Sequence, residues 1–226
     1  MGLRSADAAL QYSILQRGWG ASLIESLGGN ALQASTVAGN GILGLTPYAT
    51  VISAMALGST IKQLIYLLWI SEQELNPGPA VAISLLNTVL NSVNTLLSLW
   101  VVSSAGTAAT LPSASIIDVL SSSPTLALGA GLYVLGIIIE LYSEIQRMVF
   151  KSKAENKGKP YGGGLWSLAT NINYGRYTLW RSGYAVTAAG WGWGLAIGAL
   201  FFYDFTSRAI PTLDEYCTEK VSFIRA

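Results

Sequence analysis

Three long apolar runs dominate the chain and constrain its fold more than any other feature. They cover about residues 48 to 70, 80 to 103 and 125 to 149, and the turn-forming sequences "NPGP" at 76 to 79 and "SSSP" at 121 to 124 separate them. A helix needs roughly 20 mostly apolar residues to cross a bilayer. Because the bilayer core offers no partner to an exposed backbone amide, we predict that each run is a transmembrane helix.

A fourth apolar region, at about 173 to 209, is too long for one span and is interrupted by "GWGWG" at 190 to 194. Glycine weakens a helix, so we predict a hairpin of two short helices; a single span, which would put the C-terminus on the other side, is the alternative. Only 11% of the residues are charged, against about 25% in soluble domains. The sequence therefore predicts an all-α polytopic transmembrane bundle of about four or five spans.

The expected organisation is a single membrane domain over residues 1–226. Its parts are a leader or interfacial segment at 1–46, three transmembrane helices at 47–149, a basic glycine-rich loop at 150–172, the helical hairpin at 173–209 and a short tail at 210–226. Seven of the thirteen basic residues lie from Arg147 to Arg181, where Glu155 is the only acid. Since lysine and arginine beside the membrane favour the cytosolic side, we expect the loop and the C-terminus in the cytosol.

Two residue counts exclude whole classes of chemistry. The chain has no histidine, which rules out Ser-His-Asp and Cys-His catalysis, an HExxH zinc site and histidine-ligated haem. It has one cysteine, Cys217, so no disulfide can form within the chain. We expect no metal site and no nucleic-acid partner.

Polar side chains recur along one face of the second predicted span. Asn87, Asn91, Asn94 and Ser98 follow one another at helical spacing. Polar groups in a bilayer face the interior of a bundle. Either they hydrogen-bond to neighbouring helices, or the three asparagines line a substrate cavity.

Ionisable residues within the spans are candidates for function. Lys62 lies eight residues from the end of the first span, so its ammonium group could extend to the membrane surface. Glu140, Glu144 and Arg147 share one helix face, which allows an ion pair or a catalytic carboxylate at Glu140. Arg147 and Lys151 end the same span, where they could bind anionic lipid headgroups or the phosphates of a nucleotide.

An ordered set of motifs in the C-terminal half is the most specific signal. A helix ending in Gln146, Arg147, Phe150 and Lys151 precedes the sequence "GKPYGGGLW", followed by Asn173-Tyr174-Gly175, the aromatic hairpin and "SRAIPTLDEYCTEK". The set resembles the membrane-embedded steroid 5-alpha-reductase C-terminal superfamily, and most closely its fungal-type DUF1295 branch. Sterol C14-reductases and isoprenylcysteine carboxyl methyltransferases are more distantly similar.

The resemblance implies a membrane enzyme, in the endoplasmic reticulum, with a cytosol-facing nucleotide pocket. In the reductases NADPH delivers hydride to a conjugated double bond, so the leading hypothesis is an NAD(P)H-dependent reductase of a lipophilic, sterol- or terpenoid-like enone or alkene. Transfer of a methyl group from S-adenosylmethionine, which the same scaffold supports, is the second hypothesis. A non-catalytic membrane protein of the same fold is the third.

Functional residues follow from the resemblance by position. Tyr174 and Glu140 are the candidate proton donors. The candidate cofactor-binding residues are Arg147, Lys151, Asn171, Asn173, Tyr174, Arg176, Arg208, Glu215 and Tyr216. Many family members read Ala-Arg-His-x-Asn-Tyr where this chain has Thr170 and Asn171 in place of the Arg-His pair, and Arg176 could restore part of the lost positive charge. The usual Arg-Tyr-Gly-x-x-Trp segment is also replaced by "VSFIRA", and both departures support the third hypothesis.

Overall fold

The computed structural model describes residues 2–32, 42–71, 76–105, 115–156, 159–168, 172–215 and 218. These residues form helices and no strand; the only β-type pairing among them is an isolated bridge between Ala31 and Trp100. Four helical stretches are long and apolar enough to cross a membrane: Pro47–Ile70, Pro77–Leu99, Pro124–Lys151 and Tyr174–Glu215. The predicted all-α polytopic bundle is confirmed, and the three apolar runs coincide with its first three spans.

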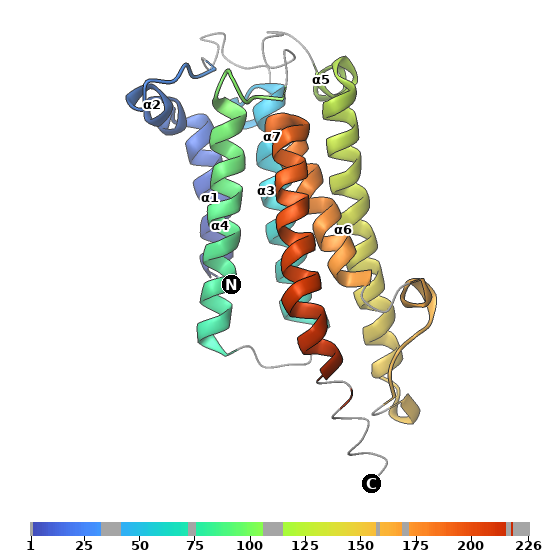
Figure 1. The fold of residues 1–226 in the computed structure, drawn as a ribbon. Coiled ribbons are helices and arrows are strands. Elements are labelled where there is room, and N and C mark those ends of the chain that lie inside the picture. The colour runs from blue at the N-terminus through green and yellow to red at the C-terminus, as the bar shows by residue number, and fades with distance from the viewer. Residues whose placement is uncertain are drawn as a thin grey trace.

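The helices follow in a simple order (Figure 1). They are α1 (Gly2–Gln16), α2 (Trp19–Ser26), α3 (Pro47–Ile65), α4 (Pro77–Leu99), α5 (Ile116–Ser122), α6 (Pro124–Lys151) and α7 (Ile172–Asp204). The π-helices η2 (Tyr66–Ile70) and η6 (Phe205–Ala209) continue α3 and α7, and short 3-10 turns lie at Ile42–Gly44 (η1), Ala154–Asn156 (η4) and Gly164–Ser167 (η5).

Residues at the helix starts explain where the helices begin. Each of α3, α4 and α6 has a proline in its first turn, where the missing N–H costs nothing. Helix α5 begins with a reciprocal capping box: the Asp118 amide donates to the Ser115 hydroxyl, and the Ser115 amide donates to the Asp118 carboxylate. These hydrogen bonds lower the pKa of Asp118.

Helix α7 is a hairpin, as predicted. Its backbone leaves the helical region at Ala189 and at Gly190, whose φ of 78° is the left-handed conformation that glycine adopts without strain. The two arms run antiparallel, because the rings of Tyr177 and Phe201 lie 5.0 Å apart despite their separation in sequence. In Figure 1 the first arm rises in orange and the second descends in red.

The ends of the helices gather at two opposite ends of the bundle. The end of η2, the start of α4, the end of α6 and the C-terminal end of the second hairpin arm lie at one end of the bundle (Figure 1). Helices α2 and α5 lie at the opposite end. The cytosolic orientation of the basic loop remains a prediction from the charge distribution.

The N-terminal helix corrects one expectation. Residues 1–46 were expected to form a leader or an interfacial segment, but α1 packs along α3 and α4 and buries Arg4, Asp7 and Gln11 within the bundle. These three polar residues recur on one helix face; Asp7 and Gln11 find polar partners on α4, and Arg4 pairs with Asp7. The charges made the segment unlike an apolar span, although they point inward.

Buried tyrosines join the spans through the backbone. The Tyr133 hydroxyl on α6 donates to the Met55 carbonyl of α3 at 2.6 Å, and the Tyr48 hydroxyl on α3 donates to the Thr187 carbonyl of α7 at 2.9 Å. A hydrogen bond satisfies the hydroxyl where no water reaches it. The aromatic core between α3, α6 and α7 is therefore held in one orientation by hydrogen bonds between the helices.

Glycines allow α6 and the first arm of α7 to pack with their backbones in close contact. A Cβ atom at Gly183 would lie 2.5 Å from the Tyr133 amide nitrogen, and one at Gly136 would lie 2.7 Å from the Trp180 amide nitrogen. Small residues at helix crossings are the usual means of close approach in membranes.

We predict that Gly183→Ala lowers the stability of the protein in detergent by about 1–3 kcal/mol, because the added methyl meets backbone atoms that cannot move independently. Thermal unfolding followed by circular dichroism measures the loss. Gly131→Ala is the matched control on α6, since a Cβ there has nothing within 4 Å. Equal unfolding temperatures for the two variants would contradict the close packing.

Candidate functional site

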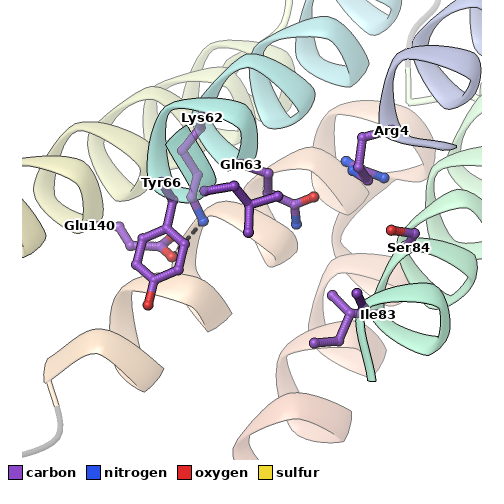
Figure 2. Close-up of a pocket in the computed structure, with 9 residues that line it drawn as sticks. Arg4, Lys62, Gln63, Tyr66, Ile83, Ser84 and Glu140 are labelled. Carbon is purple, nitrogen blue, oxygen red and sulfur yellow. Dashed lines mark hydrogen bonds and ion pairs between the residues drawn. The ribbon is translucent and has the colours of Figure 1, made fainter. Parts of the chain in front are cut away.

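A cavity of about 250 Å³ lies between α1, α3, α4 and α6. Figure 2 shows Lys62, Tyr66 and Glu140 on one side of it and Arg4, Ile83 and Ser84 on the other. Its remaining wall is made by Gln63, Leu67 and Ala80. Charged side chains next to apolar ones within a bundle form the kind of cavity that orients a small lipophilic ligand.

A buried ion pair forms one wall of this cavity. The Lys62 ammonium lies 2.5 Å from one carboxylate oxygen of Glu140, and the two side chains are 9% and 14% exposed. The Trp180 indole N–H donates to the other oxygen at 2.6 Å. Both oxygens of Glu140 therefore accept a hydrogen bond, one from Lys62 and one from Trp180.

This pairing corrects the interpretation of Lys62. Its side chain does not extend to the membrane surface, because it is buried and paired across the bundle with α6. Pairing with a nearby carboxylate compensates the charge of a buried ammonium group, so Lys62 need not extend to the headgroups. The predicted helix-face ion pair on α6 forms between Glu144 and Arg147, at 2.6 Å, while Glu140 pairs with α3 instead.

The polar surface extends from the cavity to the basic loop. The Tyr66 hydroxyl, contributed by η2, interacts with the Arg147 guanidinium. Arg147 and Arg176 both lie against the ring of Trp166, with guanidinium carbons 5.8 and 5.3 Å from its centroid. We call Glu144, Arg147, Trp166 and Arg176 the loop-end cluster. Nη2 of Arg176 is buried without a hydrogen-bond partner among the described residues.

Two hydrogen bonds fix the glycine-rich loop against α6 and create this cluster. The Leu165 amide donates to the Gln146 side chain at 3.1 Å, and the Trp166 indole donates to the Ser143 carbonyl at 2.9 Å. Gly164 has a φ of +55° there, a left-handed conformation that favours glycine. The basic, glycine-rich sequence therefore folds back onto the end of the span.

The asparagine stripe of α4 is buried but holds helices together. Asn91 donates to Asp7 at 2.8 Å and accepts from Arg181 at 2.9 Å, and Asn94 accepts from the Trp193 indole at 2.7 Å. Asn87 accepts from Gln63 at 3.2 Å. One prediction was that these three asparagines line a substrate cavity, but they do not line the cavity described here. Their amides are used by partners on α1, α3 and α7, which matches the alternative interpretation.

The predicted cofactor-binding residues fall into two groups. Arg147 and Arg176 meet at Trp166, whereas the ring of Tyr174 lies tilted against the ring of Phe205, with the two centroids 4.7 Å apart. Side chains two positions apart on a helix point in nearly opposite directions. Tyr174 and Arg176 are therefore poorly placed to bind the same part of a cofactor.

The remaining predicted residues lie near the ends of helices. Arg208 is exposed and paired with Asp204 at 2.8 Å. Lys151 is the half-buried last residue of α6, and Glu215 is exposed. Asn171, Tyr216 and the side chain of Asn173 lie outside the described part of the structure.

Sequence reasoning missed Arg4, Tyr66 and Trp166. Arg4 was overlooked because its helix was taken for a leader, although the spacing of Arg4, Asp7 and Gln11 on one helix face was a visible signal. Tyr66 lines the site because the chain turns into a π-helix there, a local widening that is frequent at functional sites. No feature of the local sequence predicts this π-helix.

A candidate proton acceptor, Glu140, lines a cavity between apolar helices. The Glu140 carboxylate retains lone pairs beyond the two hydrogen bonds it accepts, so it can take a proton from a hydroxyl group in the cavity. Lys62 stabilises its charge. No cluster of three or more potential metal ligands occurs among the described residues.

Comparison with known proteins identifies the family. The pattern of the family described as "Protein of unknown function (DUF1295)" matches residues 83–222. The chain belongs to the DUF1295 family. It is also 35% identical over 228 residues to a protein of Ustilaginoidea virens named "Probable O-methyltransferase ustE", covering 99% of this chain and 78% of that protein. No solved structure gives a significant match.

We predict that the Lys62–Glu140 pair behaves as one unit in a double-mutant cycle. Glu140→Gln or Lys62→Met alone leaves a buried charge without its counter-ion and should cost about 3 kcal/mol or more. The double variant should cost less than the sum of the two. Thermal and denaturant unfolding in detergent measure the change in the free energy of unfolding for each single variant and for the double variant.

The exposed Asp204–Arg208 pair provides the matched control. Asp204→Asn should change stability little, because solvent screens that pair. Additive effects of the Lys62 and Glu140 substitutions would show that the two side chains do not depend on each other.

Proposed function

We propose that this protein is a membrane-embedded O-methyltransferase that takes its methyl group from S-adenosylmethionine and transfers it to a hydroxyl group of a lipophilic acceptor. The observation that carries the proposal is the Glu140 carboxylate at the wall of a cavity between the spans. The likeness to a protein named as a probable O-methyltransferase over nearly the whole chain supports the same activity.

Glu140 supplies the proton chemistry of this proposal. An acceptor hydroxyl must lose its proton as its oxygen forms the new bond to carbon, and a positioned carboxylate is a suitable general base. Lys62 and the Trp180 indole hold the carboxylate toward the cavity. Because the cavity lies between apolar spans, it would take up a lipophilic acceptor from the bilayer and keep bulk water away from the reacting oxygen.

The loop-end cluster is the proposed place for the methyl donor. S-adenosylmethionine carries a carboxylate, an ammonium group and an electrophilic methyl group on sulfur. The unpartnered Nη2 of Arg176 suits the carboxylate, and Glu144, already paired with Arg147, suits the ammonium group. Tyr66 lies between this cluster and the cavity, since it lines the cavity and interacts with Arg147.

Reduction of a lipophilic enone or alkene by NADPH is the second candidate. Arg147, Lys151 and Arg176 at the loop end suit the phosphates of a dinucleotide, and the family resemblance supports such a cofactor. A reductase also needs a proton donor beside the carbon or oxygen that is protonated. Glu140 could give that proton, but both of its oxygens already accept hydrogen bonds, from Lys62 and Trp180.

Ligand-induced thermal stabilisation separates the two candidates. Purified protein should unfold at a higher temperature with S-adenosylmethionine or S-adenosylhomocysteine than without, since a ligand of the native state stabilises it by mass action. NADPH should give no comparable shift. Stabilisation by NADPH alone would favour the reductase, and no shift with either ligand would contradict both enzymatic candidates.

We further predict that Glu140→Gln abolishes methyl transfer while leaving donor binding within about tenfold of the wild type, because the amide cannot accept the proton. The double variant Lys62→Met/Glu140→Gln removes the lysine that the single variant leaves unpaired, so it separates lost chemistry from lost folding. Both variants should bind S-adenosylhomocysteine and form no methylated product. Methylation by either variant at the wild-type rate would exclude Glu140 as the base.

A further inference from the structure

Arg4 has hydrogen-bonding capacity that the protein does not use. The residue is 2% exposed, and its Nη1 lies 2.6 Å from the Asp7 carboxylate. Its Nε and Nη2 are buried without a hydrogen-bond partner among the described residues. Leaving charged donors unpaired in a bilayer protein is costly, and Arg4 lines the cavity.

Asp7 cannot supply the missing partners. Its two carboxylate oxygens already accept hydrogen bonds from Arg4, from Gln11 at 2.8 Å and from Asn91 at 2.8 Å. The carboxylate is therefore well satisfied, while the guanidinium uses only one of its three nitrogens. Between Arg4 and Asp7 the shortage lies with the cation, so the group that Arg4 lacks is an acceptor.

The charge around the cavity points to the same conclusion. Arg4, Lys62 and Glu140 line the cavity, and Asp7 and Arg181, which do not line it, are connected to Arg4 through hydrogen bonds of Asp7 and Asn91. This group has three basic side chains and two acidic ones. Arg181 donates to Asn91 and to the Tyr177 hydroxyl and makes no ion pair in the described part of the bundle. One further negative charge would balance this group, and buried charges are normally paired.

We propose that the cavity binds a lipophilic acceptor that carries an anionic oxygen group, such as a carboxylate, in addition to the hydroxyl that faces Glu140. Arg4 holds the anionic group through Nε and Nη2, which form the planar fork that suits an oxyanion. Arg4 lies on the opposite side of the cavity from Glu140 in Figure 2. Arg4 therefore binds one end of the acceptor, and Glu140 removes the hydroxyl proton at the other end. Only the description of the ligand as the acceptor rests on the proposed function.

A pair of matched probes tests the anionic group in the wild-type protein. One is a hydroxynaphthoate with its hydroxyl and carboxylate at opposite ends of the ring system, and the other is its methyl ester, which has the same skeleton without the charge. Equilibrium dialysis into zwitterionic phosphatidylcholine nanodiscs, with empty nanodiscs subtracted, should give at least about tenfold tighter binding of the acid, since hydrogen bonds to charged groups contribute that much or more. Equal affinities, including no measurable binding of either probe, would overturn the proposal.

Variants then assign the effect to Arg4. Arg4→Gln removes the ion-pair partner of Asp7, so the informative comparison is Asp7→Asn against the double variant Arg4→Gln/Asp7→Asn. Asp7→Asn keeps the guanidinium and should keep the preference for the acid, and the double variant should lose it. Arg17→Gln, at an exposed residue just beyond α1, is the control and should bind like the wild type. The same preference in Asp7→Asn and in the double variant would exclude Arg4.

Adding phosphatidylglycerol to the nanodiscs distinguishes the acceptor from a membrane lipid. The acid should bind with unchanged affinity if the site takes a small acceptor. Competitive displacement by the anionic lipid would show that a headgroup occupies the Arg4 site, which would overturn the assignment to the acceptor. Because the titrations contain no methyl donor, their outcome is independent of the donor-binding and turnover tests of the proposed function.

Discussion

The cost of burying charge in an apolar bundle governs this structure. An unpaired ion inside a bilayer protein costs several kcal/mol, so a buried charge is stable only beside a compensating partner. Lys62 on α3 finds Glu140 on α6, and Trp180 on α7 donates to the same carboxylate. This single interaction joins three spans, fixes their rotation about their axes and places a carboxylate at the cavity wall.

The apolar spans and the hairpin could be predicted from the sequence because length and hydrophobicity suffice to locate a helix in a bilayer. Proline and glycine marked the boundaries, and Gly190 marked the reversal of α7. The position of α1 could not be predicted in the same way. Its buried face is polar, so Arg4 and Asp7 resembled surface residues until the partner of Asp7 on α4 was known.

The site was predicted only in part, for a physical reason. Glu140 and Arg147 were recognisable because an ionisable residue within or beside a span demands an explanation. Which residues they face depends on how helices rotate and pack, and this is set by contacts between distant parts of the chain. The sequence could not reveal that Lys62 would turn inward to α6, or that Tyr66 would lie in a π-helix between the cavity and Arg147.

The most direct test of the account is the transfer of a labelled methyl group. The wild-type protein in nanodiscs would be incubated with methyl-labelled S-adenosylmethionine and a lipophilic extract of its source organism, and the extract would be examined by mass spectrometry. The account predicts a product in which one labelled methyl group replaces a hydrogen of its precursor, and the absence of this product with Glu140→Gln. A product heavier by two hydrogens and formed only with NADPH would contradict it.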